Sequence, residues 1–187
     1  RFRSGISSGV KGIAATIGGI FVLSKASDFF QSAIADARES NRVGALTESV
    51  IKSTGGAAKI TAAQVGDLAN SLSRKTGIDD EVIQSGSNLL LTFKNVRNEA
   101  GEGANMFDRA TAAALDLSKA GFGDVNSAAK MLGKALNDPV KGINAMSRAG
   151  VTFTDKQKTM IAAMVKSGDT LGAQKLIMKE VESQVGG

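Results

Sequence analysis

The sequence contains no histidine and no cysteine. Without cysteine the chain can form no disulfide, no thiolate nucleophile and no cysteine-based zinc site. Without histidine it has no imidazole base that could activate a serine. It also lacks the G-x-x-x-x-G-K-[ST] loop that cradles phosphates. These absences predict a protein that is not an enzyme and that holds no cofactor and no metal.

Proline and aromatic residues are scarce as well, with 1 Pro, 8 Phe, no Trp and no Tyr among 187 residues, whereas 22 residues are Gly. At 42% hydrophobic and 22% charged, the composition is that of a folded protein rather than a disordered tail. A core without Trp and Tyr must be built from Ala, Leu, Ile, Val and Met. We therefore expect helices that approach one another closely over small side chains.

The formal net charge is +5, and the Lys and Arg residues are dispersed along the chain. A solvated positive face is the favoured interpretation, and contact with nucleic acid is the alternative. The candidate contacts are Arg38, Arg42, Lys52 and Arg74. No aromatic side chain is interleaved with them as a stacking platform, so the sequence predicts no specific nucleic-acid site.

An apolar run, GIAATIGGIFVLS over residues 12–24, follows the three cations Arg1, Arg3 and Lys11. This pattern imitates a secretory signal, but no convincing cleavage site precedes the charged helix that follows. About 13 apolar residues also fall short of the ~20 that span a bilayer as a helix. Self-association over small residues and insertion into a membrane surface both stay open for this leader. Its candidate contact face comprises Gly9, Gly12, Ile13, Ile17, Gly18, Gly19, Ile20 and Phe21.

A stronger helical pattern begins at Ala26, with Ser27 or Asp28 as its N-cap, and continues to Lys52. Roughly 27 residues is long for a helix in a compact domain, so we expect an exposed or oligomeric rod. The residues Thr54-Gly55-Gly56 end this helix. The sequence therefore predicts a first region over residues 1–52, a linker over 53–60 and a compact helical domain over 61–187.

Short helices with defined ends characterise the third region. Both Thr61-Ala-Ala-Gln64 and Thr154-Asp-Lys-Gln157 fit the capping box, and Asp138-Pro139 places a capping carboxylate before a proline at the first helical position. Three glycines follow cations and precede an apolar residue, which is the pattern of a helix C-terminus: Gly77, Gly121 and Gly150.

Between these ends, apolar residues recur at helical spacing in four stripes. The stripes comprise Phe107, Ala110, Ala114 and Leu117; Val125, Ala129, Leu132 and Leu136; Met160, Ile161, Met164 and Val165; and Ile177, Val181 and Val185. The very short turn Gly168-Asp169-Thr170 between the last two predicts an antiparallel hairpin. The composition of residues 88–93 is compatible with a β-strand, but no neighbouring segment is predicted to pair with it. The predicted class is therefore all-α.

Three motifs resemble sites of chemistry but lack the required context. GISSG over residues 5–9 matches a hydrolase nucleophile elbow, which needs a preceding strand and a histidine base. The acidic run Asp79-Asp80-Glu81 suggests a metal, although acids that complement a helix N-terminus explain it better. Glu99 and Glu102 could pair for acid–base work, although the glycines around them favour a solvated loop.

Several segments of the third region share the pattern of one protein family. The most specific are GKALNDPVKG (133–142), RAGVTFTDKQ (148–157), KSGDTLGAQKLI (166–177) and ESQVGG (182–187), with further similarity over 68–93 and 107–122. In these segments the chain resembles the tape measure proteins of long-tailed bacteriophages and prophages. The resemblance covers residues 61–187 and is strongest over 128–187.

The resemblance implies a structural virion protein that sets tail length, lies in the tail tube or tail tip, and is released when DNA is ejected. It implies as partners copies of the chain, tail tube and tail-tip or baseplate proteins, and tail assembly chaperones. Because the first residue is Arg rather than Met, we expect a portion of a longer protein. The alternative function is a membrane-inserting segment, in transient contact with the host membrane, that helps to form a channel for DNA.

A measuring rod is expected to be extended, whereas the caps and turns of residues 61–187 predict a compact bundle. We therefore expect this region to be a folded domain held at one end of the tail, with the rod outside this chain or beginning near Ala26.

Overall fold

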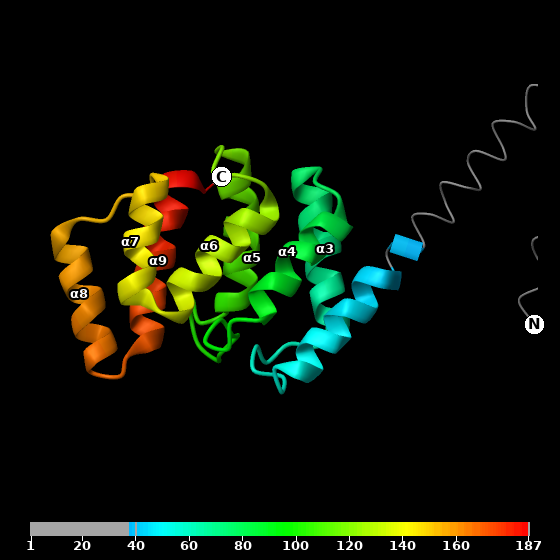
Figure 1. Ribbon diagram of the computed structural model, residues 1–187, viewed down its shortest axis with the longest axis horizontal. Helices are drawn as coiled ribbons and strands as arrows, with labels where there is room; N and C mark the ends of the chain where they lie inside the picture. Colours follow the sequence, from blue (N-terminus) through cyan, green and yellow to red (C-terminus); the bar gives the residue numbers. More distant parts are fainter. Residues whose placement is uncertain (1–37, 40, 187) are drawn as a thin grey trace, which may run out of the picture. The chain divides into compact units, whose positions relative to one another are not determined.

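The computed structural model describes residues 38, 39 and 41–186 (Figure 1). The chain divides after Ser40 into two units, of which the second is Asn41–Gly187. Every regular element among the described residues is a helix, which confirms the predicted all-α class. An isolated bridge between Asn98 and Asn105 closes a loop and does not extend into a strand.

Helical residues 41–53 precede a succession of short helices. These are α3 (Ala62–Thr76), α4 (Asp80–Leu91), α5 (Met106–Lys119), α6 (Val125–Asn137), α7 (Pro139–Ala149), α8 (Asp155–Lys166) and α9 (Thr170–Val185). The last two form the predicted antiparallel hairpin, with the turn of residues 167–169 between them (Figure 1).

The helix over residues 41–53 packs on the rest of its unit. Val43 and Thr47 are buried. Thr47 Oγ1 accepts a hydrogen bond of 3.0 Å from Gln84 Nε2 of α4. Helix α4 therefore covers one face of this stretch, so the predicted exposed or oligomeric rod is not exposed on every side here. Residues 26–37 of the predicted long helix lie outside the described residues.

The segment over residues 53–60 is also part of the unit rather than a linker. Ala58 is buried, and its carbonyl accepts a hydrogen bond of 3.0 Å from the Asn98 N–H. Lys59 Nζ lies 2.6 Å from Glu99 Oε2. The boundary between the two units consequently falls after Ser40 and not within residues 53–60, because this turn is bound to the loop that precedes α5.

Helices α5 and α6 contribute much of the core: α5 contacts α4, α6 and α9, and α6 contacts α4, α5, α7 and α9. The predicted stripes of α5 and α6 are buried throughout. In α8, which packs on α7 and α9, Ile161 is buried but Met160 is 40% exposed, so that stripe is only partly internal. Phe107 and Phe153 are the buried aromatic residues in the described part of the chain, and the remaining core is aliphatic, as expected.

Glycine ends the helices α3, α5 and α7, as the sequence predicts. Gly77, Gly121 and Gly150 have φ of 71°, 91° and 115°, in the region that favours glycine. After α7 the Val151 N–H donates to the Met146 carbonyl at 3.1 Å, and the Val151 side chain is buried. This arrangement satisfies the last carbonyls of the helix and returns the chain to the core.

Helices α6 and α7 meet at a sharp bend, the α6–α7 elbow, which we define as residues 133–142. A Cβ atom on Gly142 would lie 2.1 Å from Ala135 Cα, so the two backbones approach one another directly. A Cβ atom on Gly133 would lie 2.2 Å from Cδ2 of Phe93, so this position is covered by an aromatic ring. The elbow thus bears out the expectation of close helix approach over small residues.

Both predicted capping boxes form, and the second provides a test of their contribution. Gln157 N–H donates to Thr154 Oγ1 at 3.2 Å, and Thr154 N–H donates to Gln157 Oε1 at 2.7 Å. We expect Thr154→Ala to lower the free energy of unfolding by about 1 kcal/mol, because it leaves a helical N–H without its acceptor. In thermal denaturation this corresponds to a decrease in Tm of about 2–4 °C.

Thr159→Ala is the matched control, since Thr159 lies in the same helix and its exposed hydroxyl donates only to the Asp155 carbonyl. This variant should melt within about 1 °C of the wild type, as expected for a surface substitution. Equal losses in the two variants would contradict the role of the cap.

Candidate functional site

The predicted self-association or membrane face lies outside the described residues. It comprises Gly9, Gly12, Ile13, Ile17, Gly18, Gly19, Ile20 and Phe21. In the part of the chain that the structure describes, no helix is both long enough and apolar enough to cross a membrane.

The acidic run at residues 79–81 forms the N-terminus of α4. Asp79 is the N-cap and accepts a hydrogen bond of 3.2 Å from the Glu81 N–H, while Asp80 and Glu81 occupy the first turn. Carboxylate oxygens of all three lie within 4.8 Å of one another, close enough to hold a cation. The three acids thus lie at the N-terminus of a helix, where the sequence predicts them.

The carboxyl groups of Asp79 and Glu81 shift each other's pKa in opposite directions. A side-chain hydrogen bond to Asp79, with burial as the second cause, raises the pKa of Glu81 to about 7, and the same hydrogen bond lowers the pKa of Asp79. A carboxyl whose pKa is raised in the folded state stabilises the fold below its unfolded pKa of 4.5, and this contribution is lost as the pH rises to about 7.

We therefore expect Glu81→Gln to stabilise the protein at pH 8, where wild-type Glu81 is charged beside Asp79, but not at pH 4. Because both groups are near solvent, the expected increase in Tm at pH 8 is modest, about 1–2 °C. Thermal melts of the two proteins at both pH values measure it. The same difference in Tm at pH 4 and pH 8 would contradict the raised pKa of Glu81.

Glu99 pairs with cations rather than with Glu102. Its carboxylate lies 2.6 Å from Lys59 Nζ and 2.7 Å from Arg97 Nε. The Lys59 contact is the main cause that lowers the pKa of Glu99. Glu102 is exposed on the same loop. Glu99 thus ties the turn before α3 to the loop before α5.

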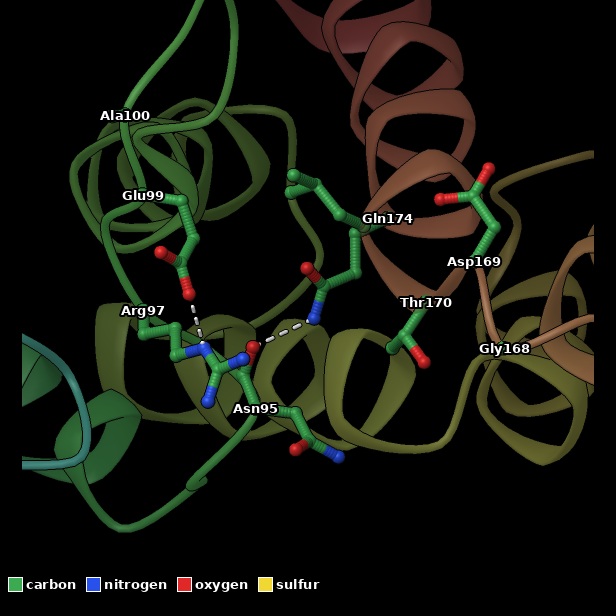
Figure 2. A pocket seen from close by; sticks show the side chains of 9 residues that line it. Asn95, Arg97, Glu99, Ala100, Gly168, Asp169, Thr170 and Gln174 are labelled. Atoms are coloured by element: carbon green, nitrogen blue, oxygen red, sulfur yellow. Dashed lines mark hydrogen bonds and ion pairs between the residues drawn. The ribbon is translucent and has the colours of Figure 1, made fainter.

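A polar pocket of about 410 Å³ lies between this loop and the turn that begins α9 (Figure 2). Arg97 and Glu99 form one wall, the first residues of α9 form the other, and Gln174 lies between them (Figure 2). The full lining comprises Asn95, Arg97, Glu99, Ala100, Gly168, Asp169, Thr170, Leu171 and Gln174.

Gln174 is the most buried polar side chain of this pocket, with 3% of its surface exposed. Its Nε2 donates to the Asn95 carbonyl at 2.7 Å (Figure 2). The same Nε2 donates to the Leu136 carbonyl at 2.8 Å. One amide therefore joins α9 to the end of α6 and to the loop after α4. The charges of Arg97 and Glu99 neutralise each other. The polar side chains of the pocket therefore hold three elements together, and the pocket offers no nucleophile paired with a base.

No motif in the sequence marks Gln174 as a functional residue. The available signal is its position on α9, next to Ala173 and one turn before Ile177 and Met178, all of which are buried. A polar residue on an apolar stripe indicates either a buried hydrogen bond or a ligand, and only the structure distinguishes the two.

The candidate nucleic-acid contacts are distributed over separate positions. Arg42 and Lys52 lie at opposite ends of the helix over residues 41–53, Arg74 lies in the last turn of α3, and Arg38 precedes the unit. At the end of α3 a positive charge is favourable for the helix itself.

Comparisons with known proteins do not place the chain in a family. No protein-family model, no curated protein and no solved structure matches it.

Proposed function

We propose that this chain is a folded helical portion of a tail tape measure protein, a structural component of a phage or prophage tail. The main support for the proposal is the position, in the structure, of the segments that resemble tape measure proteins. GKALNDPVKG spans the α6–α7 elbow, RAGVTFTDKQ spans the end of α7 and the capping box of α8, and KSGDTLGAQKLI spans the α8–α9 turn. The resemblance thus concerns the residues that determine where helices stop and start.

The chemistry of the described residues supports a structural role. Asp79, Asp124, Asp138 and Asp169 cap helices. Glu99 and Glu182 form ion pairs with basic residues. These carboxylates therefore stabilise the fold. The chain would lie in the tail tube or tail tip, contacting copies of itself, tail tube and tail-tip or baseplate proteins, and tail assembly chaperones before assembly.

The compact packing of residues 41–186 supports a folded domain held at one end of the tail rather than a segment of the measuring rod. Immunogold electron microscopy of purified virions, with an antibody against the whole chain, tests the proposal. Label confined to one tail end before DNA ejection, and absent after it, is the expected result. Virions whose tails contain no peptide of this chain by mass spectrometry would contradict it.

A second candidate, insertion into the host membrane, is favoured by the apolar run over residues 12–24 and its preceding cations. Release of dye from anionic liposomes by the full chain, and its loss on deletion of residues 1–25, is the expected result. Equal release by both proteins would contradict insertion through this run. Both functions can operate at different stages of infection.

A further inference from the structure

A groove of about 280 Å³ opens beside the α6–α7 elbow. Phe93, Gly142 and Ala145 supply its mostly apolar lining, together with Lys134, Asn137, Asp138 and Lys141. The groove depends on the two glycines of the elbow. The Phe93 ring occupies the space that a side chain at position 133 would take, and α7 can approach α6 only because position 142 has no Cβ.

Lysines flank this apolar floor on both helices. The side chain of Lys141 is 88% exposed and lies 3.4 Å from the Asp138 carboxylate, a weak contact. Lys134 is exposed, and no carboxylate in the described residues pairs with it. Lys94, next to Phe93 in the chain, is exposed as well. An apolar floor with a positive rim is complementary to an acidic segment that carries an exposed apolar side chain.

The same chain presents such a segment at the first turn of α4. Three carboxyl groups, those of Asp79, Asp80 and Glu81, gather there. The next residue, Val82, is 45% exposed and is one of the few large apolar side chains on the described surface. The acidic turn and the groove are therefore opposite in charge, and each offers apolar surface to the other.

The two surfaces lie at opposite ends of one helix. Val82 is in the first turn of α4, whereas Phe93 follows its last residue, Leu91. A helix of 12 residues is about 18 Å long, so one copy cannot place its own acidic turn in its own groove. Contact between copies through these two surfaces would instead be head to tail, an arrangement that propagates from one copy to the next.

We propose that the first turn of α4 in one copy docks in the elbow groove of a second copy, with Val82 on the apolar floor and the carboxylates beside Lys134 and Lys141. This inference rests on the proposed function, in which copies of the chain contact one another, and assigns that contact to named surfaces. A nucleic-acid strand fits the groove less well, because the mostly apolar floor offers few hydrogen-bonding groups to a base, whereas it can accept the Val82 side chain.

Sedimentation velocity of the full chain at low ionic strength is the first test. We expect species larger than a dimer that grow with protein concentration and diminish with added salt. The groove variant K134E/K141E and the acidic-turn variant D80N/E81Q/V82Q should each raise the apparent Kd at least tenfold. The control K156E/K166E makes the same change of charge on exposed positions of α8 and should associate like the wild type.

Mixing the two variants gives the decisive result. Each has lost one surface and keeps the other, so an equimolar mixture should form 1:1 dimers and nothing larger. Circular dichroism melts establish that each variant is folded, and Ala145→Glu replaces the groove variant if K134E/K141E does not fold.

Two outcomes would overturn the proposal. The first is that both variants associate as strongly as the wild type, or that their equimolar mixture stays monomeric. The other is binding of a DNA oligonucleotide that K134E/K141E abolishes, without self-association, which would assign the groove to nucleic acid. Neither outcome changes the expected labelling of virion tails, so failure of this contact is distinguishable from failure of the proposed function.

Discussion

Gly142→Ala should lower the free energy of unfolding by about 3 kcal/mol, the upper part of the usual cost of overpacking a core. The added Cβ would lie 2.1 Å from Ala135 Cα and 2.8 Å from Ala135 N, so it meets backbone that cannot rotate away. Helices α6 and α7 must separate to accept it. Thermal denaturation should show a decrease in Tm of about 6–12 °C.

Gly66→Ala is the control for this substitution. Gly66 lies within α3, and a Cβ atom there would meet nothing within 4 Å. Alanine should therefore stabilise the protein by up to about 1 kcal/mol, because it favours the helix over the unfolded chain. Similar effects of the two substitutions would contradict the close approach at the elbow.

Gly133→Ala tests whether a clash with a movable side chain costs less stability than the clash of Gly142→Ala with backbone. Its Cβ would meet the ring of Phe93, which is half-buried and can move toward solvent. The loss should be smaller than for Gly142→Ala, about 1–2 kcal/mol. In a double-mutant cycle, Phe93→Ala should relieve the loss, because the clash partner is then absent.

Gln174→Leu should cost about 3 kcal/mol, because it leaves the Asn95 and Leu136 carbonyls without their shared donor. Leucine retains most of the side-chain volume and the helix propensity of glutamine. The decrease in the free energy of unfolding therefore measures the contribution of the two Gln174 hydrogen bonds. Urea denaturation should show a lower midpoint with an unchanged m-value.

Gln184→Leu is the matched control for Gln174→Leu. Gln184 is also on α9, and its Nε2 donates to the Thr152 carbonyl at 2.8 Å, but the side chain is exposed and water can replace it. Its substitution should change stability by less than about 0.5 kcal/mol. A comparable loss at both positions would show that burial of the Gln174 amide does not matter.

The features that sequence reasoning predicted are those encoded within one helix. The capping boxes at Thr61 and Thr154, the glycine stops after α3, α5 and α7, and the stripes of α5 and α6 each depend on residues within a few positions of one another. Such local signals can be recognised without knowledge of the tertiary fold.

The features that it missed depend on residues far apart in the chain. The contact of the helix over residues 41–53 with α4 depends on a hydrogen bond between Gln84 and Thr47, which are 37 residues apart. The role of Gln174 depends on its hydrogen bond to the Asn95 carbonyl, 79 residues away. The elbow groove likewise requires Phe93 to meet Gly133, which no periodicity indicates.

The measurement that tests the account most directly is cross-linking within assembled tails. Arg109 donates to both carboxylate oxygens of Glu182, at 2.8 and 2.7 Å, which joins α5 to α9. The chain has no cysteine, so R109C/E182C introduces two unique thiols. A short bis-maleimide should join them within one chain, both in the purified protein and in virion tails.

In an extended helix these positions, 73 residues apart, would be separated by about 110 Å. The account predicts the same intramolecular cross-link in tails as in solution, because the unit remains folded where it acts. Tails that contain the variant chain but yield no intramolecular cross-link, or tails that contain no chain at all, would contradict it.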